Sequence, residues 1–125
     1  MARILVVDDS PTEVHVLQTI LEKNGHEVIV ADSGEAGIEK AKSALPDLVL
    51  MDMKMIKMSG MEALQQIKAI QPLLPVIMMT AYSSVDTAVK ALKIGAYDYL
   101  TKPLDFDRLR LTIARLFEHH HLKNE

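Results

Sequence analysis

Ile4-Leu5-Val6-Val7, which runs into Asp8-Asp9, and Leu48-Val49-Leu50-Met51, which runs into Asp52, decide the fold of this chain. Each is a short apolar run of strand length that stops abruptly on carboxylates. Strands that are apolar at nearly every residue are typical of a parallel sheet covered on both faces by helices. The two stretches therefore predict central strands of such a sheet.

Three further runs complete the predicted sheet. Val76-Ile77-Met78-Met79 leads into Thr80-Ala81, and Tyr97-Asp98-Tyr99-Leu100 leads into Thr101-Lys102-Pro103. The run at residues 27–31 and the last run are more mixed, so both are expected at sheet edges. Because strand-length runs alternate five times with helix-period segments, we predict an α/β doubly wound (βα)5 sandwich. Right-handed crossovers and an early chain reversal favour a five-stranded parallel sheet in the order 2-1-3-4-5.

Helix signals separate these runs. The predicted starts are Ser10-Pro11, Ser33-Gly34, Gly60, Ser83-Ser84 and about Asp105. The fourth helix carries Val85, Ala88, Val89 and Leu92 at the spacing of a core stripe, so we expect most of these four to be buried. An apolar residue left exposed near Val85 or Val89 is a candidate partner surface, including one for dimerisation.

Composition limits the class of protein. The 125 residues suffice for one domain with a core, and 49% apolar with 25% charged residues is ordinary for a globular chain. A net charge of −3 gives no basic footprint for nucleic acid. The absence of Cys excludes disulfides and thiolate metal ligands. No apolar run is long enough for a membrane span and no signal peptide is evident, so a cytoplasmic location is expected.

The residues that follow the predicted strands are expected to form one functional site. In a parallel sheet the carboxyl ends share an edge, so Asp8, Asp9 and Asp52 are expected to meet Thr80 and Lys102 there. Three carboxylates repel one another unless a cation binds, and oxygen ligands favour Mg²⁺ or Mn²⁺. Asp52, the central member, would be the nucleophile that forms an aspartyl phosphate. Lys102 would reach a phosphoryl oxygen as a point charge, and the Thr80 hydroxyl would donate to another.

Each motif alone has a structural explanation. An Asp pair after a strand is often a helix cap, a lone Asp is usually turn chemistry, and Lys-Pro is most often a surface turn. The ordered occurrence of all of them at successive strand ends favours one site instead.

The ordered set resembles the receiver domain of two-component response regulators. The matching motifs are Val7-Asp8-Asp9-Ser10, Leu50-Met51-Asp52 with Met55 and Gly60, Met79-Thr80-Ala81, and Tyr99-Leu100-Thr101-Lys102-Pro103. The resemblance covers about residues 3–117 and implies a flavodoxin-like fold. We accordingly divide the chain into a receiver domain at 1–118 and a C-terminal helix end or tail at 119–125.

The resemblance implies a role for each site residue. Asp52 would accept phosphate from the phospho-His of a histidine kinase or a phosphotransfer protein. Asp9, Asp52 and the Lys54 carbonyl would ligate Mg²⁺, with Asp8 acting largely through water. Thr80 and Lys102 would contact the phosphoryl group.

The resemblance also implies an output. Tyr99 would move inward when Thr80 is drawn to the phosphate, and the Lys102-Pro103 bond is typically cis in the family. The chain would then be a switch that changes its helix 4/strand 5/helix 5 face to control a downstream target or output domain. It would catalyse only its own phosphorylation and dephosphorylation.

Three other readings stay open. A haloacid-dehalogenase-type phosphatase usually has a second Asp two residues after its nucleophile, where this chain has Lys54. A flavodoxin-like cofactor binder would need a phosphate loop after the first strand. A receiver-like module that is never phosphorylated would not need the complete acidic set. Within the family, residues 1–26 resemble stand-alone regulators of the twitching-pilus type, and residues 78–109 resemble the receivers of enhancer-binding activators.

Two departures from the family pattern stand out. Ile56 replaces the usual Pro, which frees an N–H and is expected to loosen the loop at residues 53–60. Lys54 and Tyr82 occupy the positions that in this family line the path of the hydrolytic water, which predicts a long-lived phosphoryl group. We expect the long Lys and bulky Tyr to hinder that water, so a Lys54→Ala/Tyr82→Ala double variant should lose its phosphoryl group faster than wild type. Timed dephosphorylation of the two proteins side by side checks this, and equal rates would refute it.

Overall fold

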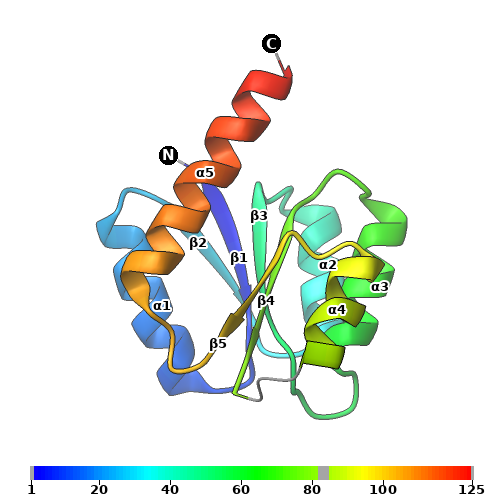
Figure 1. Ribbon diagram of the computed structural model, residues 1–125. Coiled ribbons are helices and arrows are strands. Elements are labelled where there is room, and N and C mark those ends of the chain that lie inside the picture. The colour runs from blue at the N-terminus through cyan, green and yellow to red at the C-terminus, as the bar shows by residue number, and fades with distance from the viewer. Residues whose placement is uncertain (1, 82–84, 125) are drawn as a thin grey trace.

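The computed structural model describes residues 2–81 and 85–124, with side chains described as far as Glu118. Strands and helices alternate along this part of the chain (Figure 1). The strands are Arg3–Val7 (β1), Glu27–Ala31 (β2), Leu48–Asp52 (β3), Val76–Thr80 (β4) and Asp98–Thr101 (β5). The helices are Pro11–Lys23 (α1), Gly34–Ser43 (α2), Gly60–Ile70 (α3), Val85–Ile94 (α4) and Phe106–Asn124 (α5).

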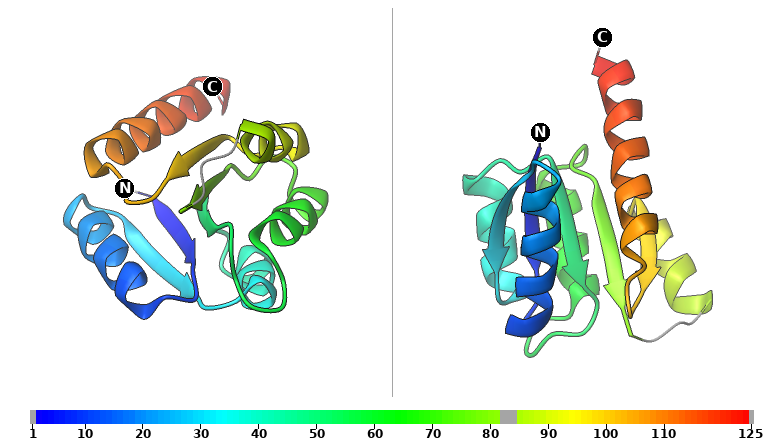
Figure 2. Two further views of the ribbon diagram at one scale, coloured as in Figure 1. Left: turned by 60° about the horizontal axis from the view of Figure 1, so that its bottom comes forward. Right: turned by 90° about the vertical axis from the view of Figure 1, so that its left-hand side faces the viewer.

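All five strands form one parallel sheet in the order β2-β1-β3-β4-β5, as the sequence predicted. Helices α1 and α5 cover one face, and α2, α3 and α4 cover the other (Figure 2). The register pairs Val7 with Met51 and Thr80 with Thr101. The carboxyl ends of β1, β3, β4 and β5 therefore lie along the same edge of the sheet.

The core has two halves, one on each face of the sheet. Alternate residues of the central strands point to opposite faces, so each strand contributes to both halves. Leu5, Val49 and Met78 pack under α2, α3 and α4, and Ile4 and Leu50 pack under α1 and α5. Full burial of one such side chain contributes about 1.5–3 kcal/mol. This double coverage explains why the central strands are apolar at almost every position.

Three helices begin at serine caps. The Ser10, Ser33 and Ser59 hydroxyls accept hydrogen bonds from the backbone N–H groups of Glu13 (3.4 Å), Ala36 (3.1 Å) and Glu62 (3.2 Å). Each such cap contributes about 1 kcal/mol to stability. These caps fix where α1, α2 and α3 leave the edge at which the strands end.

The edge strand β5 lies one residue later than predicted. It spans Asp98–Thr101, because its pairing with β4 begins with Asp98 opposite Ile77. Tyr97 precedes the strand and is partly exposed, although its N–H donates to the Val76 carbonyl.

The expected core stripe of α4 is wrong. Val85, Val89 and Leu92 are 79%, 43% and 49% exposed, and Ala88 is only partly buried. The side of α4 that faces the sheet is instead centred on the buried Ala91. Apolar spacing identified the helix but not which of its apolar residues face the sheet.

Helix α5 is longer than the strands it covers. Its last turns extend beyond the edge of the sheet and carry the C-terminus away from the domain (Figures 1 and 2). Among residues 2–81 and 85–124, no helix combines the length and apolarity needed to cross a membrane.

Gly60 should be irreplaceable where β3 leads into α3. A Cβ there would overlap the Asp52 carbonyl oxygen and lie 2.9 Å from the Met53 Cα. Because the colliding atoms are backbone, we expect Gly60→Ala to lower the free energy of unfolding by about 2 kcal/mol or more. Urea denaturation measures this loss.

Gly34→Ala is the matched control, since Gly34 also begins a helix. Its Cβ would meet only side-chain atoms of Met58, with Sδ at 2.9 Å, Cγ at 3.0 Å and Cβ at 3.1 Å, and no backbone atom is among these contacts. We expect this variant to change stability by less than about 1 kcal/mol, with the better helix propensity of Ala offsetting the contact. Equal losses in the two variants would contradict the backbone explanation.

Candidate functional site

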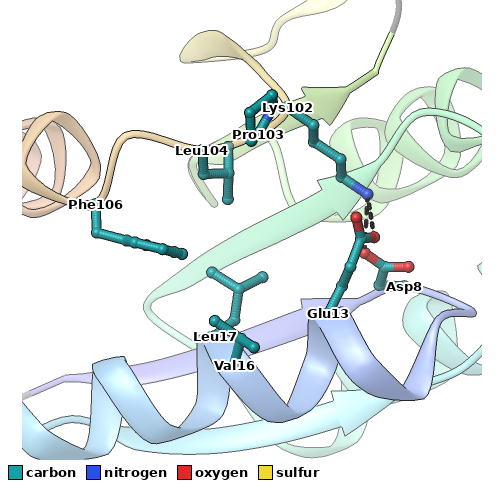
Figure 3. Close-up of a pocket in the computed structure, with 8 residues that line it drawn as sticks. All are labelled: Asp8, Glu13, Val16, Leu17, Lys102, Pro103, Leu104 and Phe106. Carbon is teal, nitrogen blue, oxygen red and sulfur yellow. Dashed lines mark hydrogen bonds and ion pairs between the residues drawn. The ribbon is translucent and has the colours of Figure 1, made fainter.

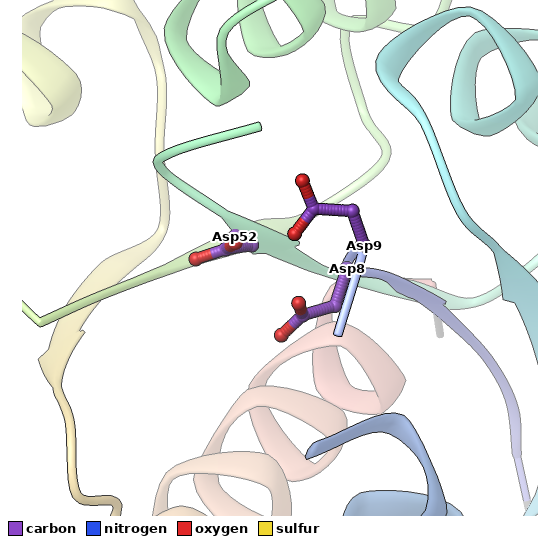
Figure 4. Close-up of side chains that lie close together, drawn as sticks. All are labelled: Asp8, Asp9 and Asp52. Carbon is purple, nitrogen blue, oxygen red and sulfur yellow. The ribbon is translucent and has the colours of Figure 1, made fainter. Parts of the chain in front are cut away.

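Three carboxylates meet at the carboxyl edge of the sheet. Asp8 and Asp9 directly follow β1, and Asp52 is the last residue of β3. Because β1 and β3 are neighbours in register, carboxylate oxygens of the three residues all lie within 4.8 Å of one another. Figure 4 shows the three side chains gathered at this edge. The structure thus brings together the acidic set that the sequence predicted.

Burial makes two of these carboxylates costly to ionise. Asp8 is 1% and Asp52 is 6% exposed, whereas Asp9 is exposed. Burial is the main cause that raises the pKa of Asp8 to about 6; the charge of Asp52 adds to the rise, and the Ser10 N–H and Lys102 oppose it. Burial also raises the pKa of Asp52, against the opposing effect of Lys102. A bound cation would relieve this conflict.

Lys102 provides the positive charge among the described groups that contact these carboxylates. Its backbone N–H donates to the Thr80 carbonyl at 2.6 Å, and the Lys102-Pro103 bond is cis, as the resemblance implied. Its Nζ lies 3.2 Å from Asp8 Oδ2 and 3.1 Å from Asp52 Oδ1. Burial lowers the pKa of Lys102, but hydrogen bonds to Glu13 and Asp52 outweigh that effect and hold it above its usual range. Lys102 is therefore charged throughout the physiological range.

Glu13 is a member of the site that the sequence analysis missed. Its Oε2 accepts a hydrogen bond from Lys102 Nζ at 2.5 Å, as Figure 3 shows. This hydrogen bond lowers the pKa of Glu13. Ser10-Pro11-Thr12-Glu13 fits a capping box, in which Glu13 would bond back to the Ser10 N–H. In the structure the Ser10 N–H instead donates to Asp8 Oδ1 at 2.9 Å, which leaves the Glu13 carboxylate available for Lys102.

Thr80 and Tyr99 lie on neighbouring strands, with Thr80 at the end of β4 and Tyr99 within β5, opposite Met78. Thr80 ends β4, is 2% exposed and pairs with Thr101. Tyr99 is partly buried and packs against the half of the core that lies under α2, α3 and α4. Strand pairing therefore places Thr80 beside Lys102, whose N–H donates to the Thr80 carbonyl, and Tyr99 lies three residues before Lys102 in the chain.

The loop between β3 and α3 carries Lys54, one of the two residues predicted to line the rim of the phosphate site. Lys54 and Ile56 are exposed, the latter at 78%. The loop is closed by a hydrogen bond of 2.9 Å from the Gly60 N–H to the Met53 carbonyl, so it has a defined path without the usual Pro. Tyr82, the other predicted rim residue, lies outside the described residues.

The donor set fits a hard divalent cation. Three carboxylate oxygens within one small volume, with no His or Cys among them, match the preference of Mg²⁺ and Mn²⁺ for oxygen ligands. An ammonium beside the same carboxylates can neutralise a phosphoryl oxygen. The arrangement suits the binding of a cation and a phosphoryl group side by side.

Comparison with known proteins agrees with this geometry. The profile of the "Response regulator receiver domain" family matches residues 4–114. Transcriptional regulatory protein ZraR of Klebsiella oxytoca is 51% identical over 116 residues, which are 93% of this chain and 26% of ZraR. The chain therefore spans about a quarter of the length of that relative.

A relative of similar length and a solved structure extend the comparison. Protein PilH of Pseudomonas aeruginosa is 44% identical over 90% of this chain and 95% of PilH. The crystal structure of a CheY-like response regulator receiver domain protein from Methanospirillum hungatei JF-1 superposes with a TM-score of 0.93 and 31% identity, covering 98% of both chains. Together with the family profile, these matches show that this chain belongs to the response regulator receiver domains.

Proposed function

We propose that residues 1–118 form a phosphorylation-activated switch in which Asp52 accepts a phosphoryl group from the phospho-His of a sensor histidine kinase or a phosphotransfer protein. One observation carries this proposal: the nearly buried Asp52 lies beside Asp8 and Asp9 and is contacted by Lys102 Nζ at 3.1 Å. A nucleophilic carboxylate, metal ligands and a cationic group for the phosphoryl oxygens thus occupy one site. We place this activity in the cytoplasm.

The carboxylates of Asp8, Asp9 and Asp52, with the Lys54 carbonyl, would hold Mg²⁺, and Mn²⁺ could take its place. Bound there, the ion would neutralise carboxylate charge and the charge on the transferring phosphoryl oxygens. The raised pKa values of Asp8 and Asp52 support this assignment, because buried carboxylates that resist ionisation gain most from a cation.

The transfer itself needs a nucleophile, positioning and neutralisation of charge. An Asp52 carboxylate oxygen forms the new O–P bond while the P–N bond to the donor imidazole breaks, and the imidazole keeps that electron pair. Lys102 and Thr80 would contact the phosphoryl oxygens and hold the group in line. Hydrolysis of the resulting acyl phosphate by water returns Asp52, so the chain catalyses only its own modification. Lys54 and Tyr82 would form the rim that this water must pass.

Phosphorylation would add nearly two negative charges beside Lys102 and Thr80. We propose that Thr80 and Tyr99 respond by shifting a pre-existing equilibrium of the α4–β5–α5 face. The exposed Val85, Val89 and Leu92 on α4 support this face as the one that contacts a downstream target, an output domain or, on phosphorylation, a second copy. We assign neither nucleic-acid nor membrane binding to this chain.

Asp52→Asn should abolish phosphorylation, because the amide keeps the shape of the side chain but not its nucleophilic oxygen. The measurement is intact mass after incubation with Mg²⁺ and acetyl phosphate, which detects one added phosphoryl group. Asp32→Asn is the matched control: Asp32 is an exposed carboxylate just after β2 at the same sheet edge, and its variant should still be labelled. Labelling of Asp52→Asn, or none of wild type, would refute the switch, and turnover of a free phosphate ester would indicate an enzyme.

Affinity for Mg²⁺ should fall as the pH drops through about 6. Asp8 has a pKa raised to about 6, so below that pH its carboxyl is protonated and must lose the proton before it can act as a ligand. We expect roughly tenfold weaker binding per pH unit below the pKa and a plateau above it. Calorimetric titration with Mg²⁺ at several pH values measures this. Weakening that begins only near pH 4, where ordinary carboxyls titrate, would contradict it.

A further inference from the structure

The Lys102 ammonium is fully committed in this structure. An ammonium has three protons to donate and no acceptor. Lys102 Nζ contacts Asp8 Oδ2 at 3.2 Å, Asp52 Oδ1 at 3.1 Å and Glu13 Oε2 at 2.5 Å. Any phosphoryl oxygen that Lys102 is to contact must therefore displace one of these three acceptors.

The three acceptors are not equivalent. Asp8 and Asp52 belong to the carboxylate cluster proposed to hold the cation, whereas Glu13 lies outside that cluster, in the first turn of α1. The Glu13 backbone N–H donates to the Ser10 cap, but its carboxylate does not receive the Ser10 N–H, which donates to Asp8 instead. Its carboxylate is thus an anchor for Lys102 on a different element of the fold, and it also lies within hydrogen-bonding reach of the Asp8 carboxyl.

The surroundings strengthen this contact. The side chains of Glu13 and Lys102 line a cavity of about 160 Å³ whose other walls include Leu17, Leu104 and Phe106 (Figure 3). Apolar walls on this side reduce the screening of the ion pair by water. The Lys102 side chain is only 13% exposed, although that of Glu13 is 43% exposed.

We propose that Glu13 is a positioning residue that competes with the phosphoryl group for Lys102 while drawing the ammonium away from the oxygens of Asp8 and Asp52 that the cation needs. This inference rests on the proposed phosphoacceptor function. It assigns Glu13 two effects of opposite sign. The carboxylate weakens the binding of a phosphoryl group and strengthens the binding of Mg²⁺.

The opposite signs follow from charge. Without the Glu13 carboxylate, Lys102 relies on Asp8 and Asp52 and competes more strongly with Mg²⁺. Loss of the Glu13 carboxylate also frees the Lys102 ammonium from one of its three acceptors and removes a negative charge near the site where the phosphoryl group would bind. A variant that merely loosened the fold would weaken the binding of both Mg²⁺ and the phosphoryl group. Weaker binding of one with tighter binding of the other therefore distinguishes a positioning role from structural damage.

The test compares Glu13→Gln and Glu13→Ala with wild type. Calorimetry gives the Mg²⁺ affinity, and fluorine NMR gives the beryllofluoride affinity at saturating Mg²⁺. We expect Mg²⁺ to bind about two- to fivefold more weakly and beryllofluoride about two- to fivefold more tightly, a modest change because Glu13 is partly exposed. Glu22→Gln is the matched control, since Glu22 lies on the same helix and its described partner is Gln18. Neither affinity should change in that variant.

A double-mutant cycle locates the effect on Lys102. In a Lys102→Ala background, Glu13→Gln should leave the Mg²⁺ affinity nearly unchanged, because the competing ammonium is gone. An equal effect of Glu13→Gln with and without Lys102 would overturn the proposal, as would unchanged or jointly weakened affinities in the single variants. If wild type itself binds no beryllofluoride, the proposed function fails; if wild type binds it and Glu13→Gln matches wild type, only this inference fails.

Discussion

The parallel pairing of β1 with β3 brings Asp8 and Asp52 into one nearly buried site, and the cost of ionising two buried carboxyls there is the constraint on which the rest of the site depends. Burial raises the pKa of both carboxyls, and Lys102 opposes that rise from the end of β5. The sheet order matters because β4 lies between β3 and β5. The Lys102 side chain must therefore extend past the end of β4, where Thr80 lies, to contact Asp52 and Asp8. A single geometric constraint thereby fixes both the charge conflict and the groups that relieve it.

The sheet was predictable because its signals were local. Apolar runs that end on Asp8, Asp52 and Thr80 identified the buried strands, and the sheet order followed from general rules of chain crossing. The orientation of α4 was not predictable in the same way. Its apolar residues recur at helical spacing, but Val85, Val89 and Leu92 face solvent while the small Ala91 packs against the sheet. Periodicity shows that a helix has an apolar side; it does not show whether that side meets the core or a partner.

The candidate site was predictable as far as strand ends define it, and Glu13 shows where that rule stops. Its sequence context, Ser10-Pro11-Thr12-Glu13, is compatible with a capping contact within α1, which is a local interaction. The contact that forms instead joins residues 89 positions apart, and it exists because Asp8 occupies the Ser10 N–H. Asp8 and Glu13 are both possible acceptors for the Ser10 N–H, and sequence spacing does not show which of them lies nearer. The exposure of Lys54 was likewise not readable from the sequence, although its position two residues after Asp52 was.

Charge also orders the events that such a site can support. Three carboxylates, those of Asp8, Glu13 and Asp52, contact the ammonium of Lys102. The Asp9 carboxylate lies beside those of Asp8 and Asp52, so acidic groups outnumber the one ammonium at the site. A phosphoryl group would add nearly two more negative charges, which makes prior binding of a cation the favourable sequence. If a cation occupied Asp8 and Asp52, Lys102 would lose two of its three acceptors. The remaining competition would then be between Glu13 and the phosphoryl oxygens, so on the proposed function this one contact would influence how readily the domain becomes phosphorylated.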